Sequence, residues 1–361
     1  MMIKMVGALL RRIYSSFATN ILDVPPRLLA FLLLMVLLFL PVARLDLYIL
    51  RIVTIALIFA IFAASWDLLV GRAGQVSLGH ALFFGIGAYL SAYLSRFHGL
   101  PLWATIPLSM LFCALVAVLL GFPCLRVKGP YLTLVTMAFP LILAVGFFAL
   151  DPPFGGEGGI ALTRAQRLFP MEALYPQRVA EYYLILFLLL VSAIILYKIA
   201  NSKTGIVLVS ILDDESASKA CGINVTKYKL LAWAISAFFA GLAGCLYAHY
   251  IQATPPTTVL GLTTSFYPVI MTILGGIGTI YGPIVGAFIL WSLMEFTLWV
   301  LTDFFQFIPF IANAGDELRI IVYIGIIIVF IIKWPKGISK FVVEKLDELT
   351  EKRELDERKK K

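Results

Sequence analysis

The chain has 361 residues, of which 61% are hydrophobic and only 14% are charged. Soluble domains carry about 45–50% apolar and about 25% charged residues, so this sequence has too few charges to cover a water-soluble surface. Its net charge of +8 comes from basic clusters beside apolar runs, which is typical of membrane spans and not of nucleic-acid-binding surfaces. We therefore predict an integral membrane protein that lies in a lipid bilayer.

Ten segments are predicted to cross the membrane. A span needs about 20 mostly apolar residues. The first such run begins only after residue 27, so residues 1–27 are predicted to be a cytoplasmic segment without a cleaved signal peptide. The predicted spans cover residues 28–45, 47–69, 77–95, 101–124, 131–150, 181–199, 230–251, 265–277, 282–302 and 318–334. The eighth is short and rich in glycine, which predicts a broken or re-entrant segment.

Basic residues predict the orientation of these spans. With the N-terminus in the cytoplasm, 22 of the 29 Lys and Arg residues fall on the cytoplasmic side. Cytoplasmic loops of membrane proteins are enriched in these residues, so this orientation is favoured. Both termini are then cytoplasmic, and residues 339–361 form a charged cytoplasmic tail. The longest outer loop, at 151–180, separates five spans from five. Because five is odd, the second half should be inverted relative to the first, as in many transporters.

A polar loop at residues 201–228 lies between apolar runs on the predicted cytoplasmic side. Acidic residues precede small ones, and acids at a helix N-terminus interact favourably with the helix dipole. Glycine and asparagine then suit a helix end. We predict a helix of about two turns that a cytosolic partner can grip; an ordinary loop helix is the alternative. The candidate coupling residues are Asp213, Asp214, Glu215, Ala217, Gly222 and Asn224.

Two glycine-rich stretches, at residues 71–89 and 274–288, predict close helix packing or a flexible gate beside a substrate pathway. Glu295 lies inside the ninth predicted span, where an ionisable residue is a candidate for function and a structural pair is the alternative. Asp67, near the inner end of its span, could pair with Arg72. The candidate pathway residues are Gly74, Gln75, Ser77, Gly79, His80, Gly278, Gly282 and Glu295.

Motifs for catalysis are missing from the sequence. It contains no phosphate-binding loop, no zinc-protease motif and no nucleophile-elbow motif. No metal site is predicted, because His80 has no second histidine within reach in the sequence. We therefore expect no enzyme, no cofactor and no metal. Energy for transport must come from a partner or from an ion gradient.

An ordered set of motifs resembles one family of transporters. The motifs lie at residues 71–80 and 81–89, at 213–215, 222–224 and 228–232, at 274–283, and at 333–337. Together they span about residues 50–338 and resemble the permease subunits of ABC-type importers of branched-chain amino acids, the LivM-like group. The general coupling pattern of ABC permeases is imperfect here, because Gly222 lies seven positions after Glu215 and Ser216 replaces an alanine.

The resemblance implies an all-α polytopic fold of the type II ABC importer permease kind, with its transmembrane domain at residues 28–338. It implies four kinds of partner: the bilayer, a second homologous permease subunit, two cytosolic ATPase subunits and an extracytoplasmic substrate-binding protein. The implied location is the inner membrane of a prokaryotic cell. The expected function is ATP-driven import of branched-chain amino acids by alternating access. A permease for urea or short amides, or an ion-coupled secondary transporter, is the alternative.

Overall fold

The computed structural model describes residues 37–43, 46–127, 129–150, 153–171, 173–299, 324–335 and 337–339, with single residues at 35, 321, 341 and 345. One compact unit, Leu47–Ile338, contains almost all of the elements below and is described by itself. The segment at 1–27, most of the first predicted span at 28–45 and most of the tail at 339–361 lie outside the described residues.

Helices form nearly all of this unit, because in a membrane each backbone group must find its hydrogen bond within its own segment. The described residues contain no strand beyond an isolated bridge between Ala161 and Ala253. The α-helices are α3 (Leu47–Asp67), α4 (His80–Phe97), α5 (Leu102–Cys124), α6 (Pro130–Ala149), α7 (Leu174–Ala200), α8 (Lys203–Asp213), α9 (Glu215–Ala220), α10 (Val225–Ile251), α11 (Pro256–Val259), α12 (Leu262–Gly275) and α13 (Tyr281–Trp299). A π-helical turn, η3 (Leu68–Arg72), continues α3, and two short 3-10 turns, η4 (Gly156–Gly158) and η5 (Arg164–Gln166), follow α6.

Six segments of the described chain are long and apolar enough to cross a membrane. They are Leu47–Arg72, Leu102–Cys124, Pro130–Ala149, Leu174–Ala200, Val225–Ile251 and Pro256–Gly275. Shorter apolar helices lie at Tyr281–Glu295 and Ile324–Lys333. An all-helical architecture with six candidate membrane spans is thus confirmed for the described residues, while the total of ten spans and the inverted halves stay predictions.

The eighth predicted span starts earlier in the structure than the sequence predicts. The sequence predicts a short segment from residue 265, but the structure has a helical path of 20 residues from Pro256. Two helices make up this path, α11 and α12, with Pro256 at the first position of α11, where a missing N–H costs nothing. Threonine and glycine lower the apolar character of the first turns, which is why hydropathy alone places the start too late.

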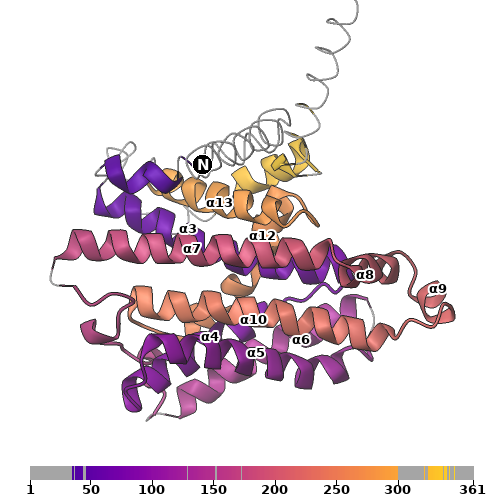
Figure 1. Cartoon of the computed structure of the whole chain (residues 1–361), viewed down its shortest axis with the longest axis horizontal. Coiled ribbons are helices and arrows are strands. Elements are labelled where there is room, and N and C mark those ends of the chain that lie inside the picture. The colour runs from indigo at the N-terminus through magenta and orange to yellow at the C-terminus, as the bar shows by residue number, and fades with distance from the viewer. Residues whose placement is uncertain are drawn as a thin grey trace, which may run out of the picture. The chain divides into compact units, whose positions relative to one another are not determined.

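The core of the unit is built by α3, α4 and α10 (Figure 1). α10 packs against α4 and α5, and α3 packs against α7, α10, α12 and α13. An early helix of the chain, α3, therefore packs against the late helices α10, α12 and α13. Small residues bring α4 and α10 together, because a Cβ atom on Gly244 of α10 would lie 1.9 Å from the carbonyl oxygen of Phe84 in α4.

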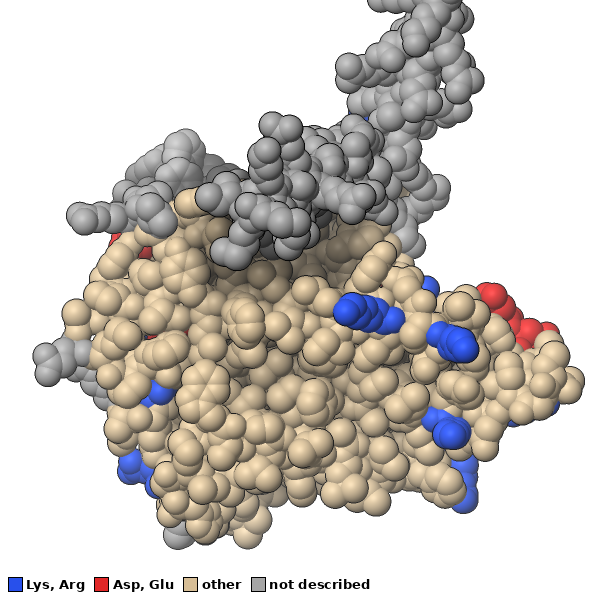
Figure 2. All heavy atoms as spheres, in the orientation of Figure 1, with Lys and Arg blue, Asp and Glu red and all other residues tan. Residues whose placement is uncertain are grey.

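Loops and charges lie at two opposite ends of these helices. Figure 2 shows a broad surface without Lys, Arg, Asp or Glu, and charged residues of both signs around α8 and α9 at its right-hand edge. An uncharged band of this kind matches the hydrocarbon layer of a membrane. We call the end that carries α8, α9 and the loops at 73–79, 125–127 and 276–280 the α9 end.

Candidate functional site

The loop between α7 and α10 contains two helices, α8 and α9, where the sequence predicts one. α9 begins at the predicted acidic stretch. The side chain of Asp214 caps it by accepting hydrogen bonds from the backbone N–H groups of Ser216 and Ala217, at 2.8 and 3.0 Å. Such caps stabilise a helix start by about 1 kcal/mol. Asp213 ends α8 and is exposed.

The end of α9 is set by Gly222, which has a φ of +80° that other residues rarely adopt. Asn224 has a different position from the one predicted. Its side chain accepts a hydrogen bond from the backbone N–H of Lys227 at 3.1 Å, so it caps the start of α10 and does not end α9. The sequence alone misplaces it because asparagine suits both helix ends.

Glu215, the first residue of α9, lies between two lysines. The ammonium group of Lys219 donates to Oε1 and that of Lys229 donates to Oε2, each at 2.7 Å. Lys219 is one turn further along α9, whereas Lys229 belongs to α10, so the second pair joins α9 to α10. Hydrogen bonds from Lys219 and Lys229 lower the pKa of Glu215 to about 2. Neither lysine is among the coupling residues predicted from the sequence.

Acidification should weaken this connection. The pKa of Glu215 falls from 4.5 to about 2 on folding, so the ionised pairs contribute stability that is complete above pH 4.5 and lost as the pH falls towards 2. Because the Glu215 side chain is 31% exposed, the contribution should be about 1 kcal/mol or less. Thermal unfolding of the solubilised protein from pH 7 down to about pH 3 measures it.

The variants for this measurement are Glu215→Gln and a matched control, Glu157→Gln. Glu157 is exposed and lies at the opposite end of the unit. Glu215→Gln should lose part of the acid dependence seen in the wild type, and Glu157→Gln should keep it. Equal acid dependence in all three proteins would contradict the role of the two lysine pairs.

α8 connects α9 to the first glycine-rich stretch. Ser218 in α9 is buried and donates its hydroxyl to the carbonyl oxygen of Ser210 in α8, at 3.0 Å. Leu212, near the end of α8, packs on Gly74, where a Cβ atom would lie only 2.5 Å from Cδ1 of the leucine. The structure therefore brings the predicted coupling loop and the predicted gate loop into direct contact, and no signal in the sequence links the two.

Most polar residues of the first glycine-rich stretch are buried by helix packing. The indole N–H of Trp66 donates to the carbonyl oxygen of Ser77 at 2.8 Å. His80, the first residue of α4, shares a hydrogen bond of 2.7 Å with the hydroxyl of Ser236 in α10. Gly79 lies against α6, because a Cβ atom there would lie 2.3 Å from the carbonyl oxygen of Thr136. These contacts favour the packing interpretation for Ser77, Gly79 and His80 in this conformation.

The second glycine-rich stretch is held by a buried carboxylate. Asp67, at the end of α3, is fully buried. Its Oδ1 accepts a hydrogen bond from the backbone N–H of Gly278 at 2.6 Å, and its Oδ2 accepts one from that of Ile280 at 3.0 Å. The sequence suggested Arg72 as a partner and gave no sign of these backbone donors. Asp67 therefore fixes the loop between α12 and α13.

Four glycines bring three distant chain segments into backbone contact beside Asp67, and we call this the glycine junction: Gly71, Gly276, Gly278 and Gly337. A Cβ atom on Gly71 would lie 2.5 Å from Cα of Gly278, and one on Gly337 would lie 2.4 Å from Cα of Gly276. Gly282 takes part in the neighbouring contact of α12 and α13, because a Cβ atom on Gly275 would lie 1.8 Å from its carbonyl oxygen.

Glu295 lies apart from the other candidate pathway residues. It is near the end of α13, and the hydroxyl of Tyr48 at the start of α3 donates to its Oε2 at 2.5 Å. The loop between α12 and α13 lies at the other end of α13. In this conformation the contact joins two helices, as the structural alternative predicts.

The comparisons with known proteins converge on transport permeases. A model of the family described as "Branched-chain amino acid transport system / permease component" matches residues 48–331. The high-affinity branched-chain amino acid transport system permease protein LivM of Salmonella typhimurium is 32% identical over 260 residues, which cover 66% of this chain and 61% of LivM. LivM of Escherichia coli is 30% identical over 260 residues, which again cover 66% of this chain and 61% of LivM. The ribose import permease protein RbsC of Haemophilus influenzae is 26% identical over 28% of this chain and 32% of its own.

The chain thus spans about three fifths of the length of the LivM relatives it matches. No solved structure matches it. The matched residues 48–331 contain α3 to α13, together with Asp67 and the loop that carries α9.

Proposed function

This chain belongs to the family of permease components of branched-chain amino acid transport systems, and we propose from this premise that it is the membrane-spanning subunit of an ATP-driven importer of aliphatic amino acids. It is a transport subunit and not an enzyme. Its proposed partners are a second homologous permease subunit, two cytosolic ATPase subunits and an extracytoplasmic binding protein. The proposed location is the inner membrane of a prokaryotic cell.

The α9 end is proposed to face the cytoplasm. The distribution of Lys and Arg supports this orientation, because most of them lie in the loops of that end and in the tail. The loops at 153–171 and 252–255 then face outwards and meet the binding protein. In that orientation α9 points towards the ATPase subunits.

A continuous path of contacts supports a mechanical role for α9. A push on α9 is passed to α10 through the ion pair of Glu215 with Lys229. It is also passed through α8, where Leu212 packs on Gly74 in the loop after η3. η3 in turn contacts the loop between α12 and α13 at the glycine junction. Movement of one external helix can therefore reach both glycine-rich stretches.

The observation that carries the proposal is α9 itself, which is a capped helix with an exposed small residue, Ala217, at its surface. Small residues let a partner approach closely. Its ends are fixed by Asp214 and Gly222, and its first residue is joined to α10. A short helix held in this way can transmit force without melting.

Ala217→Arg tests the docking of the ATPase. A long charged side chain on the exposed face of α9 should prevent close approach and lower both amino-acid-stimulated ATP hydrolysis and uptake by about tenfold or more, which corresponds to about 1.4 kcal/mol of lost association. The measurement uses the assembled transporter in proteoliposomes, with the binding protein added outside.

Thr257→Arg is the matched control. Thr257 is exposed in α11 at the opposite end of the unit, so the same arginine, with the same added charge, is introduced away from α9. ATPase association and ATP hydrolysis measured without the binding protein should be close to the wild-type values in this variant. Normal uptake by Ala217→Arg would contradict the assignment of α9. Uptake driven by a proton or sodium gradient without the ATPase would instead support an ion-coupled transporter.

A further inference from the structure

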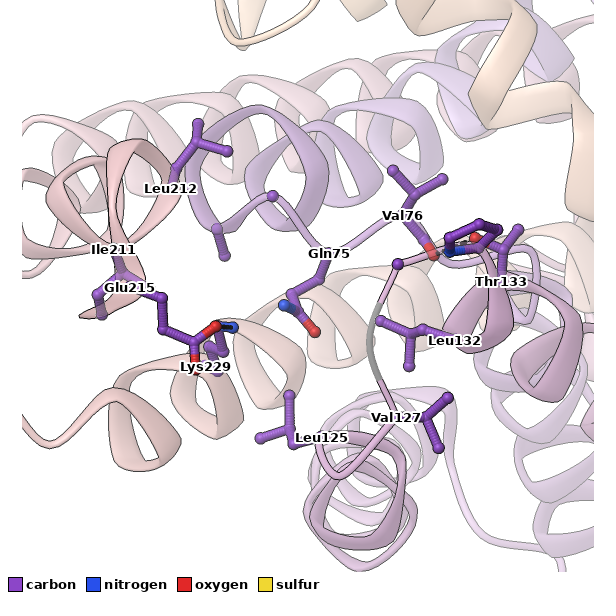
Figure 3. A pocket seen from close by; sticks show the side chains of 14 residues that line it. Gln75, Val76, Leu125, Val127, Leu132, Thr133, Ile211, Leu212, Glu215 and Lys229 are labelled. Atoms are coloured by element: carbon purple, nitrogen blue, oxygen red, sulfur yellow. Dashed lines mark hydrogen bonds and ion pairs between the residues drawn. The ribbon is translucent and has the colours of Figure 1, made fainter. Parts of the chain in front are cut away.

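A cavity of about 420 Å³ lies at the α9 end, beside the coupling helix (Figure 3). Its walls come from the loop at 73–76, from residues 125, 127 and 129 between α5 and α6, and from the first turn of α6. The end of α8, the start of α9 and Lys229 of α10 complete them. Cavities that hold small molecules commonly measure about 300–1,000 Å³ and combine apolar walls with a few polar groups. This cavity has both properties.

Gln75 points into the cavity from one wall, as Figure 3 shows. Only 7% of the residue is exposed, and its side-chain carbonyl oxygen, Oε1, accepts no hydrogen bond from any residue that the structure describes. An amide oxygen buried in this way costs about 1–3 kcal/mol unless a donor reaches it. The cavity therefore presents an acceptor that is oriented but unsatisfied.

The ion pair of Glu215 and Lys229 forms part of another wall. The side chain of Lys229 is only 13% exposed, and that of Glu215 is 31% exposed. The cavity therefore presents both a carboxylate and an ammonium group to a ligand. A molecule that carries both an ammonium and a carboxylate group can interact with each partner of the pair.

Aliphatic side chains form much of the remaining surface, with Leu125, Leu132 and Leu212 among them. Figure 3 shows these leucines around the Gln75 amide and the ion pair. Burying an aliphatic side chain of a ligand against them is worth about 1.5–3 kcal/mol. The polar groups and the apolar wall thus match the two parts of an aliphatic amino acid.

We propose that this cavity is a binding site for a free aliphatic amino acid at the α9 end of the permease. The ammonium group would donate to Oε1 of Gln75 and to Glu215, the carboxylate would accept from Lys229, and the side chain would lie against the leucines. The choice of an amino acid as the ligand rests on the proposed function. Because Glu215 and Leu212 line the same cavity, its occupant touches the coupling helix and its connection to Gly74.

Equilibrium dialysis of radiolabelled L-leucine against the full-length permease, in nanodiscs of phosphatidylcholine, tests the site directly. The wild type should bind leucine saturably, and Gln75→Leu should bind at least about tenfold more weakly. Thermal unfolding without leucine should show Gln75→Leu to be as stable as the wild type or more so, because an unpartnered buried oxygen is removed. Leu125→Trp, which places a larger side chain in the cavity and leaves Gln75 unchanged, should also lose binding.

The matched control is Gln177→Leu. Gln177 is a buried glutamine of α7 whose Oε1 also has no partner among the described residues, and it lies at the opposite end of the unit. It should bind leucine like the wild type. Equal affinity of Gln75→Leu and the wild type, or displacement of leucine by phosphatidylethanolamine, whose headgroup carries the same pair of charges, would overturn the proposal.

ATP-driven leucine uptake by the assembled wild-type transporter separates the two ideas. If uptake occurs but dialysis shows no binding at the cavity, the inference fails and the proposed function stands. If dialysis shows binding that depends on Gln75 but no ATP-driven uptake occurs, the site stands and the proposed function fails.

Discussion

Replacement of Asp67 by alanine should lower the free energy of unfolding by about 2–6 kcal/mol, because two backbone donors, one buried and one half-buried, lose their acceptor and each loss costs about 1–3 kcal/mol. The donors are the N–H groups of Gly278 and Ile280. Ile280 has a φ of +60°, a conformation that a β-branched residue adopts only under constraint. Without the carboxylate, the loop between α12 and α13 should leave this conformation and uptake should be lost.

Thermal unfolding of the solubilised protein and uptake in proteoliposomes measure these two effects. Asp67→Asn keeps the shape of the side chain but offers one acceptor oxygen where Asp67 offers two, so it should fall between the wild type and Asp67→Ala. Glu157→Ala removes one negative charge from an exposed position at the other end and should resemble the wild type. Wild-type stability of Asp67→Ala would show that the loop does not depend on the carboxylate.

Gly244→Ala should damage the fold more than any exposed substitution. The added methyl carbon would lie 1.9 Å from the carbonyl oxygen of Phe84 and 3.1 Å from the backbone nitrogen of Ala88. Both obstacles are backbone atoms, so no rotamer change can relieve the overlap and α4 must separate from α10. Overpacking usually costs about 1–3 kcal/mol, and a backbone clash at the centre of the core should reach or exceed the upper value.

Gly146→Ala is the matched control, since it makes the same change in a helix. A Cβ atom on Gly146, in α6, would have no neighbour within 4 Å. This variant should gain up to about 1 kcal/mol from the higher helix propensity of alanine. The yield of folded protein in detergent and its unfolding temperature measure both variants. Similar values for the two would mean that α4 and α10 do not need their close approach.

The sequence predicted the class of fold well, because hydrocarbon solvent requires long apolar helices and hydropathy detects them directly. It also predicted a helix start in the acidic stretch at 213–215 and a helix end at Gly222, since both depend on residues close by in the chain. The starts of α7 and α10 were placed too late, at 181 and 230, where the structure has Leu174 and Val225. Polar residues in those first turns are helical, and hydropathy does not register them.

Contacts between distant residues were beyond the reach of sequence reasoning. Asp67 and Gly278 are more than two hundred positions apart, and nothing local indicates that one binds the other. Leu212 looks like an ordinary apolar residue until it is seen on Gly74. Gln75 was predicted to be functional as part of a gate, yet its orientation into a cavity beside Glu215 depends on four separate segments.

The glycine junction has a mechanical consequence. Where side chains meet, a small displacement can be absorbed by a change of rotamer, and the neighbouring helix need not respond. At Gly71, Gly276, Gly278 and Gly337 the main chains themselves touch, so no side chain lies between them to absorb a displacement. A displacement of the segment at Gly276–Gly278 is therefore passed directly to the main chain at Gly71 and at Gly337, which makes the joint stiff.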